Sequence, residues 1–558
     1  MTNKTKQNKK KLSNKNKNYE FPGFVSFGFL FLTSLKACAG SVSPNALPTG
    51  YKSVAGDVQF NQNSKTNTLN ISSKAARSIA EFNQFNVGKR STVNFNLPGS
   101  KSAILGRVTG GVRSEIYGNI NSNGQVFLVN PSGILFGSTA QINVSSLIAS
   151  TLDISDKDFL KGELTFKRNG SGGAIVNKGK INVDKGGAAV LLGSAISNEG
   201  IVNAAKGQIH FAVGDQISVP LSNGLVVDVK VDKDLKKSLD NYNKAIKNTG
   251  TLKADNGLVK IQAKLAKKVY EQAVNIEGQI DAGGLANNNG VIEIVADGKG
   301  SNATVATSGN LTASSIDISA DESVKIGKTK DNKTSTIKAK GGDINITAQR
   351  GDIRINDRVI ADGEGNIIAK AKQDISISDG SSSKTNTLLA SSKGEIELTS
   401  QRGDVNIRDR VSTSGDIDID SKEGKVNISD GQKGNNAHLV SSRGKGSVNI
   451  DAKKDINVRD GVFSQDGKID LDSSRGDINI SDGSSSKTNT LLASSKGEIE
   501  LTSQRGDVNI RDRVSTSGDI DIDSNQGEVN ISDGQKGNNA NLVSSRGKGS
   551  VDIDAKKD

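Results

Sequence analysis

Cysteine is almost absent from this sequence: Cys38 is the only one in 558 residues. It lies at the end of an apolar leader, so a chain that has lost the leader has no thiol for a disulfide or a thiolate metal site. Histidine is nearly as rare, and neither His210 nor His438 stands beside a nucleophile in a catalytic motif. We therefore predict that the protein is not an enzyme and uses no cofactor or metal. A polysaccharide lyase built on aspartates is the enzymatic alternative.

Tryptophan is missing, aromatic residues make up 4% of the chain and proline occurs 6 times, whereas glycine occurs 62 times. A chain of this length is too long for one compact core, so it forms either several domains or one repeat architecture that grows in one direction. Abundant glycine with few prolines and aromatics is typical of short strands joined by tight turns. The composition favours an all-β solenoid.

Excess positive charge is concentrated at the start of the chain. The formal net charge is +12, but residues 1–39 contain eight Lys and one Glu, which leaves about +5 for the remainder, with acids and bases interspersed. A surface for a phosphate backbone needs a basic patch or stripe. The sequence therefore predicts no nucleic-acid partner.

The first 39 residues are typical of an extended signal peptide. A basic region with seven Lys over residues 1–20 precedes an apolar run from Phe21 to Leu35, which is too short for a permanent membrane span. Ala37 and Ala39 form an Ala-x-Ala signal, so we predict cleavage after Ala39. A retained membrane anchor and lipidation at Cys38 are the alternatives.

Beyond the leader, polar and apolar residues alternate in short segments. The segment Ser91 to Leu97 has Val93 and Phe95 on one face, the pattern of a half-buried strand. Ile175 to Ile181 recurs in related form 21 residues later, with Asn-x-Gly at the corner. A period near 20 fits one coil of a β-helix, because glycine adopts positive φ at the corner and the apolar residues point into the stack.

The pattern changes between Asp232 and Ile276. Lys233 to Leu239 and Leu258 to Ala273 include helical spacing and more Lys. We expect a helical excursion or lid on the solenoid in this region.

One motif is specific. The segment that begins at Ser122 ends in Asn130-Pro131-Ser132-Gly133-Ile134. It resembles the Asn-Pro-x-Gly-Ile signature of the haemagglutination-activity domain of filamentous haemagglutinin and the high-molecular-weight adhesins. A second Asn-Pro motif is missing, so the sequence is more similar to the high-molecular-weight adhesins. Three flanking segments agree with the same family: Gly56 to Val58, Phe82 to Val87 and Ala149 to Ser155.

The resemblance implies a two-partner secretion exoprotein with a right-handed parallel β-helix. Residues 40–290 would form the secretion domain, recognised by the POTRA repeats of a dedicated outer-membrane β-barrel transporter after passage through Sec. The expected secretion motif is Asn130, Pro131, Gly133 and Ile134. A purely structural role is equally open, because Asn-Pro-x-Gly is a turn former in which Pro131 fixes φ and Gly133 tolerates positive φ.

Residues 291–558 are predicted to be a repetitive β-helix. Ile377 to Asp455 (377–455) recurs almost unchanged as Ile480 to Asp558 (480–558), an offset of 103 residues, and a weaker unit recurs about every 52. Each unit has a glycine corner before alternating residues, as in Gly394 to Leu398. The second copy stops where the first continues, so we expect a piece of a longer protein.

Arg-Gly-Asp occurs four times in the repeats and has two interpretations. A projecting loop of this kind presents a cation and a carboxylate to an integrin, whereas a solvated glycine corner needs the same residues for its turn. The copies are Arg350-Gly351-Asp352, Arg402-Gly403-Asp404, Arg475-Gly476-Asp477 and Arg505-Gly506-Asp507.

Asn-x-Ser/Thr sequons are plentiful, and many arise by chance in such a composition. The resembled adhesins are glucosylated at sequons by a cytoplasmic transferase, so we expect modification of some of them. The sequon asparagines are Asn70, Asn143, Asn169, Asn302, Asn310, Asn332, Asn345, Asn427, Asn479 and Asn530.

Asp416, Asp418 and Asp420 alternate with Ile417 and Ile419. Such a carboxylate row either binds Ca²⁺ or forms a solvated face, and the missing Gly-Gly-x-Gly-x-Asp nonapeptide favours the solvated face.

The function that these observations favour is adhesion at the bacterial surface, to a receptor or glycan of host cells or to neighbouring bacteria. The alternative from another class is the stalk of a contact-dependent growth-inhibition toxin or haemolysin. Capture of a haem carrier, as in related secreted proteins, is a third.

Overall fold

The computed structural model describes residues 42–170, 172–283, 290–298, 303–327, 334–379, 387–431, 438–482, 490–532 and 542–557. The predicted cleavage residues Ala37 and Ala39, and the sequon residues Asn302 and Asn332, lie outside the described residues. The described residues form 59 β-strands and one short helix, α1 (Asp156–Lys161), and Val42–Asp558 is one compact unit. No helix among them is long and apolar enough to cross a membrane.

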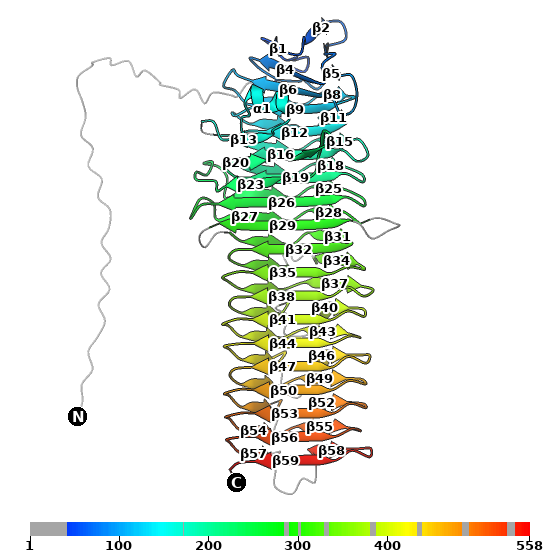
Figure 1. The fold of residues 1–558 in the computed structure, drawn as a ribbon, viewed down its shortest axis with the longest axis vertical. Helices are drawn as coiled ribbons and strands as arrows, with labels where there is room; N and C mark the ends of the chain where they lie inside the picture. The colour runs from blue at the N-terminus through cyan, green and yellow to red at the C-terminus, as the bar shows by residue number, and fades with distance from the viewer. Residues whose placement is uncertain are drawn as a thin grey trace, which may run out of the picture. The chain divides into compact units, whose positions relative to one another are not determined.

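Three stacked sheets build a right-handed parallel β-helix, which confirms the predicted fold class. We call them sheet 1, with 19 strands from β1 (Lys52–Ala55) to β59 (Val551–Ala555), sheet 2, with 16 strands from β7 (Ser114–Ile116) to β57 (Val529–Ile531), and sheet 3, with 19 strands from β2 (Gln59–Asn63) to β58 (Val543–Ser545). Figure 1 shows their strands stacked layer on layer along the chain, from blue to red.

One coil contributes one strand to each sheet. A representative coil consists of β44 (Ile417–Ser421) in sheet 1, β45 (Val426–Ile428) in sheet 2 and β46 (His438–Ser442) in sheet 3. The next coil pairs with it in parallel and in register, so that Val448 lies beside Ile417 and Ile456 beside Val426. Because the pairing is parallel, each residue of one coil has the same neighbour position in the next.

A column of apolar side chains fills the interior. Alternate residues of each strand point inward, as the burial of Ile417, Ile419 and Ser421 in β44 shows. Equivalent positions carry Ile or Val in coil after coil, and a single apolar cluster extends from Val58 to Ile522. Full burial of each such side chain stabilises the fold by roughly 1.5–3 kcal/mol relative to exposure. The predicted alternation of polar and apolar residues is confirmed.

The sequence repeats correspond to whole coils. In the repeats, the sheet 1 strands begin at Ile396, Ile417, Val448, Ile469, Ile499, Ile520 and Val551, so coils of 21 residues alternate with coils of 30 or 31. Two coils therefore make the unit of about 52 residues, and four coils make the repeat of 103. The equivalent side chains of two successive units lie two layers apart on the same face.

The first coil is closed by antiparallel strands. β2 pairs with β3 (Thr68–Ser72), and β1 pairs with β4 (Arg77–Phe82), both antiparallel. These strands cover the N-terminal edge of the stack, which would otherwise present unpaired N–H and C=O groups.

A second, smaller core lies on the outer face of sheet 1 near the N-terminus. Helix α1 and a three-stranded antiparallel sheet of β13 (Thr165–Lys167), β20 (Gln216–Ser218) and β23 (Lys230–Lys233) cover the face there. Phe127 of β9 (Gln125–Val129) contacts Phe159 of α1 edge-on, with ring centroids 5.1 Å apart. Because this outer face is apolar in the early coils, it needs the cover.

The expected helical excursion between Asp232 and Ile276 was wrong. The segment Leu258 to Ala273 contains strands β26 (Leu258–Leu265) and the beginning of β27 (Gln272–Ile276), and Lys233 to Leu239 is irregular after β23. In β26 every second residue is buried, and its lysines lie on the outer face. A period of two also places apolar residues at i and i+4, so the spacing that indicated a helix equally fits this strand.

Candidate functional site

The predicted secretion motif forms a buried corner between sheets 1 and 2. Asn130 follows β9 and is 1% exposed. Its Nδ2 donates hydrogen bonds to the backbone oxygen of Val112 and to Ser114 Oγ, both at 2.9 Å, and its Oδ1 accepts one from the backbone N–H of Ser132. The first two bonds join neighbouring coils and the third closes the turn. The Asn130 carboxamide thus makes all three hydrogen bonds inside the corner, and almost none of its surface is exposed.

The other motif residues shape the same corner. The backbone N–H of Gly133 donates to the oxygen of Asn130 at 3.0 Å, and Gly133 has φ of 113°. A Cβ at this position would lie 3.1 Å from the backbone oxygen of Ala174 in the next coil, so both the backbone conformation and the space favour glycine. Ile134 begins β10 (Ile134–Phe136) and is fully buried in the column. Pro131 is half-buried between Asn130 and the exposed Ser132.

A charged cluster beside this corner escaped the sequence reasoning. Arg107 of β6 (Ala103–Val108) bonds Asp153 Oδ1 at 3.1 Å and also pairs with Asp156 at the start of α1. Burial lowers the pKa of Arg107, but the hydrogen bond to Asp156 and the charge of Asp153 outweigh it and leave the pKa raised. This cluster holds α1 on sheet 1. The signal for it was Asp153 within the flanking segment Ala149 to Ser155, but nothing in the sequence identified the partner 46 residues earlier.

Hydrogen-bonded rows of asparagine run along the outer faces of sheets 2 and 3. In each row the Nδ2 of one residue donates to the Oδ1 of its neighbour in the adjacent coil, at 2.8 to 3.4 Å. The sheet 2 asparagine ladder comprises Asn406, Asn427, Asn457, Asn479, Asn509 and Asn530. The sheet 3 asparagine ladder comprises Asn70, Asn94, Asn121, Asn143, Asn182 and Asn203.

Five of the predicted sequon asparagines are members of these ladders. Asn427, Asn479 and Asn530 occupy every second position of the sheet 2 ladder, and Asn70 and Asn143 lie in the sheet 3 ladder. The Nδ2 atom that a glycosyltransferase would modify is a hydrogen-bond donor in four of them: Asn143, Asn427, Asn479 and Asn530. Elsewhere, Asn345 donates to Asp317, and Asn169 and Asn310 are exposed. Glucosylation at any of these positions stays a prediction.

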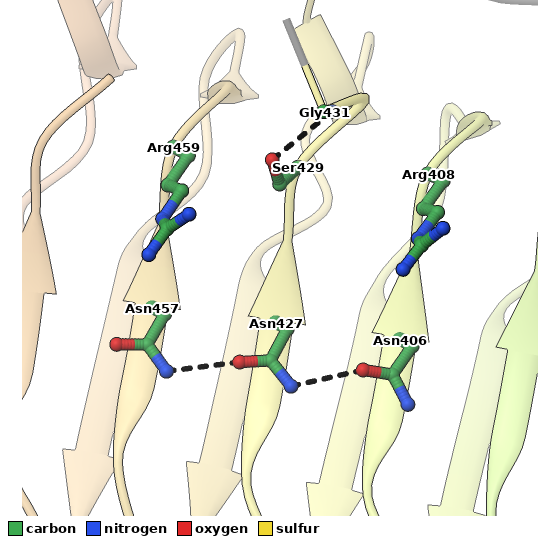
Figure 2. A pocket seen from close by; sticks show the side chains of 7 residues that line it. All are labelled: Asn406, Arg408, Asn427, Ser429, Gly431, Asn457 and Arg459. Atoms are coloured by element: carbon green, nitrogen blue, oxygen red, sulfur yellow. Dashed lines mark hydrogen bonds between the residues drawn. The ribbon is translucent and has the colours of Figure 1, made fainter. Parts of the chain in front are cut away.

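Beside the sheet 2 ladder lies a row in which arginine and serine alternate. Arg408, Ser429 and Arg459 come two residues after successive asparagines of the ladder, and Ser481 and Arg511 continue the alternation. Figure 2 shows Arg408 and Arg459 on either side of Ser429, with both guanidinium groups directed toward the asparagine row. A cavity of about 360 Å³ is lined by Asn406, Arg408, Asn427, Ser429, Gly431, Asn457 and Arg459.

The Arg-Gly-Asp segments lie at corners just before the sheet 2 strands. In three of them the aspartate accepts a backbone N–H of the next coil: Asp404 from Lys425 at 2.8 Å, and Asp477 from Asp507 and Asp507 from Glu528, both at 2.9 Å. In the first, Arg350 pairs with Asp321 and Glu322, and Asp352 accepts from Arg354. The carboxylates that an integrin would contact therefore already bind within the fold. Gly351 and Gly403 allow close packing of neighbouring coils. Integrin recognition stays a prediction.

The outer face of sheet 1 in the repeats is acidic. Asp418 and Asp420 project from β44, and a cavity of about 500 Å³ extends over them to Asp451 and Asp470. Burial raises the pKa of Asp451 to about 6, and Asp420 and Asp472 add repulsion. In the described ranges, no group of three or more His, Cys, Asp or Glu side chains is arranged to hold a metal ion.

The two histidines lie far apart in the fold. His210 in β19 (Gln208–Val213) is 1% exposed and bonds Gln208 through Nε2, and burial with the charge of Lys260 lowers its pKa to about 4. His438 lies in β46 of the repeats, where burial and the charges of Arg410 and Arg443 lower its pKa. The structure does not bring them together.

The buried Asn-Pro-x-Gly corner in the early coils and the antiparallel cap at the N-terminal edge define a right-handed parallel β-helical protein. Residues 46–313 match the family model of the TPS secretion domain, and the chain is a two-partner secretion exoprotein. The family predicted from the Asn130 to Ile134 motif is thus confirmed. The boundary predicted at residue 290 stays a prediction.

The chain is similar to two curated proteins of Haemophilus influenzae, each named heme/hemopexin-binding protein. One, from strain ATCC 51907 / DSM 11121 / KW20 / Rd, is 33% identical over 142 residues, 25% of this chain and 15% of the relative. The other is 26% identical over 348 residues, 59% of this chain and 36% of the relative. The chain therefore spans well under two thirds of the length of these relatives.

Two solved structures are also similar. The HMW1 secretion domain from Haemophilus influenzae aligns with 91% of this chain and 100% of its own, with a TM-score of 0.38 at 19% identity. The filamentous hemagglutinin secretion domain aligns with 68% of this chain and 100% of its own, with a TM-score of 0.29 at 14% identity.

Proposed function

We propose that this exoprotein displays an adhesive surface outside the cell, on the coils that follow its secretion domain. The observation that carries the proposal is the stack itself: the apolar side chains lie inside, while the same polar rows recur on the outer faces in coil after coil. A repeated polar face offers many identical contact points, so that weak single contacts add up by multivalency. The proposal contains no catalytic step.

Export begins, in this proposal, with the coils that contain Asn130. The POTRA repeats of the outer-membrane transporter bind the unfolded or partly folded secretion domain after a Sec signal peptide has been removed at Ala39. Asn130 acts through folding: its bonds to Val112 and Ser114 fix one coil on the next. A seeded stack then adds one coil at a time outside the cell, because each new coil needs only its predecessor as a template.

The test for adhesion uses the full chain expressed with its transporter. An in-frame deletion of residues 396–498 removes four whole coils and joins Glu395 to Ile499, a junction that the chain already contains as Glu498-Ile499. We expect normal export and at least severalfold fewer attached bacteria on host cells. Unchanged attachment of the deletion strain would refute the proposal, and immunoblots of the culture medium control for export.

Capture of a haem carrier is the second candidate. It is favoured by the relatives, which are named heme/hemopexin-binding proteins, and by the 348-residue match, which is longer than the matched secretion domain. The discriminating experiment incubates the secreted chain with immobilised hemopexin in the presence and absence of haem. Saturable retention of the chain on hemopexin, without attachment of the bacteria to cells, would favour capture of a haem carrier as the function and refute adhesion.

A further inference from the structure

Three arginines on sheet 2 have side chains without a partner in the part of the chain that the structure describes. Arg408, Arg459 and Arg511, which we call the arginine ladder, follow strands β42 (Val405–Ile407), β48 (Ile456–Val458) and β54 (Val508–Ile510). All three are exposed, and their backbone N–H groups bond to the preceding coil, but no guanidinium group among them forms a hydrogen bond or ion pair with any residue that the structure describes. On sheet 1, by contrast, lysines such as Lys370 and Lys468 pair with carboxylates of neighbouring coils.

The spacing of the arginine ladder is set by the coils. The arginines occur in every second coil, and at about 4.8 Å per layer they lie about 10 Å apart. Ser429 and Ser481 occupy the coils between them, and a cavity lies over the small side chain of Ser429, between Arg408 and Arg459. The sheet 2 asparagine ladder runs parallel to the row, two residues away along each strand.

Further positive charge lies on one side of the arginine ladder, at the start of the sheet 3 strands. Arg410 and Arg513 begin sheet 3 strands two residues after Arg408 and Arg511, while the aspartate between each pair, Asp409 or Asp512, is buried. Charges of Arg410 and Arg443 contribute, after burial, to the lowered pKa of His438 at the same corner.

Carboxylates on the other side of the asparagine ladder point to backbone groups. Asp404, Asp477 and Asp507 accept N–H groups of neighbouring coils at 2.8 to 2.9 Å. The asparagine ladder separates them from the arginine row, so their charges lie further from a ligand bound on the arginines than the guanidinium groups do.

We propose that the arginine ladder binds a linear acidic glycan, with one disaccharide unit for every two coils. Guanidinium groups contact sulfate or carboxylate through paired N–H bonds, which suits anionic groups that recur about every 10 Å along an extended chain. The asparagine carboxamides and serine hydroxyls supply donors and acceptors for sugar hydroxyls. The inference rests on the proposed function, because it names the ligand class of the adhesive surface.

The spacing of about 10 Å between the arginines argues against a nucleic acid as the ligand of the arginine ladder. Phosphates of a duplex strand recur about every 3.4 Å along the helix axis, about three for each arginine of the ladder. The described residues that line the cavity over the arginine ladder are Asn, Arg, Ser and Gly, and none of them is an aromatic platform for bases.

The experiment measures binding of the purified secreted chain to immobilised heparin, which carries sulfate and carboxylate. Hyaluronan, with carboxylate only, and uncharged dextran identify the anionic group, and single-stranded DNA serves as a polyanion of another class. The variant replaces Arg408, Arg459 and Arg511 by Gln. The charge-matched control replaces Lys370, Lys422 and Lys496 by Gln, three exposed lysines outside sheet 2.

For the arginine variant we expect heparin affinity at physiological salt to fall roughly 10- to 100-fold. The slope of log affinity against log salt should become smaller by about three, one for each lost contact. The control should change affinity less than threefold. An unchanged affinity of the arginine variant, or an equal loss in the control, would overturn the proposal. So would single-stranded DNA that binds as tightly as heparin and depends equally on the ladder.

A second variant tests the spacing without changing composition. Exchanging two residues, Arg459→Ser with Ser429→Arg, moves one cation by a single coil and makes the intervals about 5 and 15 Å. We expect weaker heparin binding with unchanged net charge, and undiminished binding would contradict the assignment of one disaccharide for two coils. Attachment to cells is measured in parallel. A wild-type chain that attaches to cells but does not bind heparin would refute the arginine ladder alone. Heparin binding that depends on the arginine ladder, in a chain that does not attach to cells, would refute adhesion alone.

Discussion

The carboxamide of Asn130 donates to the backbone oxygen of Val112 at 2.9 Å, across the step from one coil to the next. This bond and its partner to Ser114 satisfy both Nδ2 hydrogens in a buried place. A buried donor or acceptor that loses its partner costs about 1–3 kcal/mol. The corner is therefore one of the places where the stacking of early coils depends on a single side chain.

Asn130→Ala should block export for this reason. The substitution leaves Val112 and Ser132 without their bonds, so we expect precursor to accumulate in the periplasm and secreted protein to fall at least tenfold, measured by immunoblot of both fractions. Ser132→Ala, at an exposed position of the same turn, is the control and should be exported normally. Wild-type levels of secreted Asn130→Ala would remove the corner from the export mechanism.

Asp460 should make the repeats less stable at neutral pH than in mild acid. It is fully buried, one of its carboxylate oxygens has no partner among the described residues, and burial raises its pKa to about 7. The raised pKa means that the folded chain holds a proton which the unfolded chain releases near pH 4. The stability that the protonated Asp460 carboxyl contributes is therefore fully present below pH 4 and is lost as the pH rises through about 7.

Asp460→Asn tests this pH dependence. The substitution keeps an acceptor for the backbone N–H of Asp430 and removes the charge, so we expect the free energy of unfolding at pH 8 to rise by about 1–2 kcal/mol. Thermal unfolding followed by circular dichroism between pH 4 and 8 measures the change. Glu498→Gln, an exposed neutralisation in the same repeats, should leave the profile unaltered. An equal effect of both variants would speak against Asp460 as the origin.

His210 should give the secretion domain the opposite pH dependence. Its pKa is lowered to about 4 in the folded chain, whereas an unfolded histidine titrates near 6.5. Its contribution to stability is present above pH 6.5 and is lost as the pH falls to about 4. Hydrogen exchange of residues 208–213 should therefore accelerate between pH 6.5 and 4 beyond its intrinsic change. His210→Gln should flatten this dependence, and an unchanged pH profile in that variant would assign it to another group.

Glucosylation, where it occurs in the sheet 2 ladder, should precede folding. The Nδ2 of Asn427 lies 2.9 Å from Asn406 Oδ1 in the stack, so an enzyme has poor access to it once coils have formed. We expect intact-mass measurement of the secreted chain to lose one hexose for each of Asn427→Gln, Asn479→Gln and Asn530→Gln. Asn457→Gln, in the same ladder but outside a sequon, should lose none. Efficient modification of purified folded protein by the transferase would contradict this order of events.

The sequence by itself determined the class of fold and the family. A period of two within segments and of about 20 between glycine corners leaves few structures other than stacked coils, and Asn130 to Ile134 indicated the secretion domain. The same reasoning failed for Leu258 to Ala273, because an i, i+4 spacing is shared by helices and by strands with a period of two.

Only the tertiary structure decided which residues meet. Arg107 and Asp153 are 46 residues apart, and Arg408 and Arg459 belong to different coils, so no local pattern contains either pair. The alternation of 21-residue and longer coils converts a 52-residue repeat into two layers and thereby places like side chains about 10 Å apart. The distance between coils is set by strand pairing, but which residues lie above one another depends on how many residues each corner takes up, and the packing of the whole stack decides that.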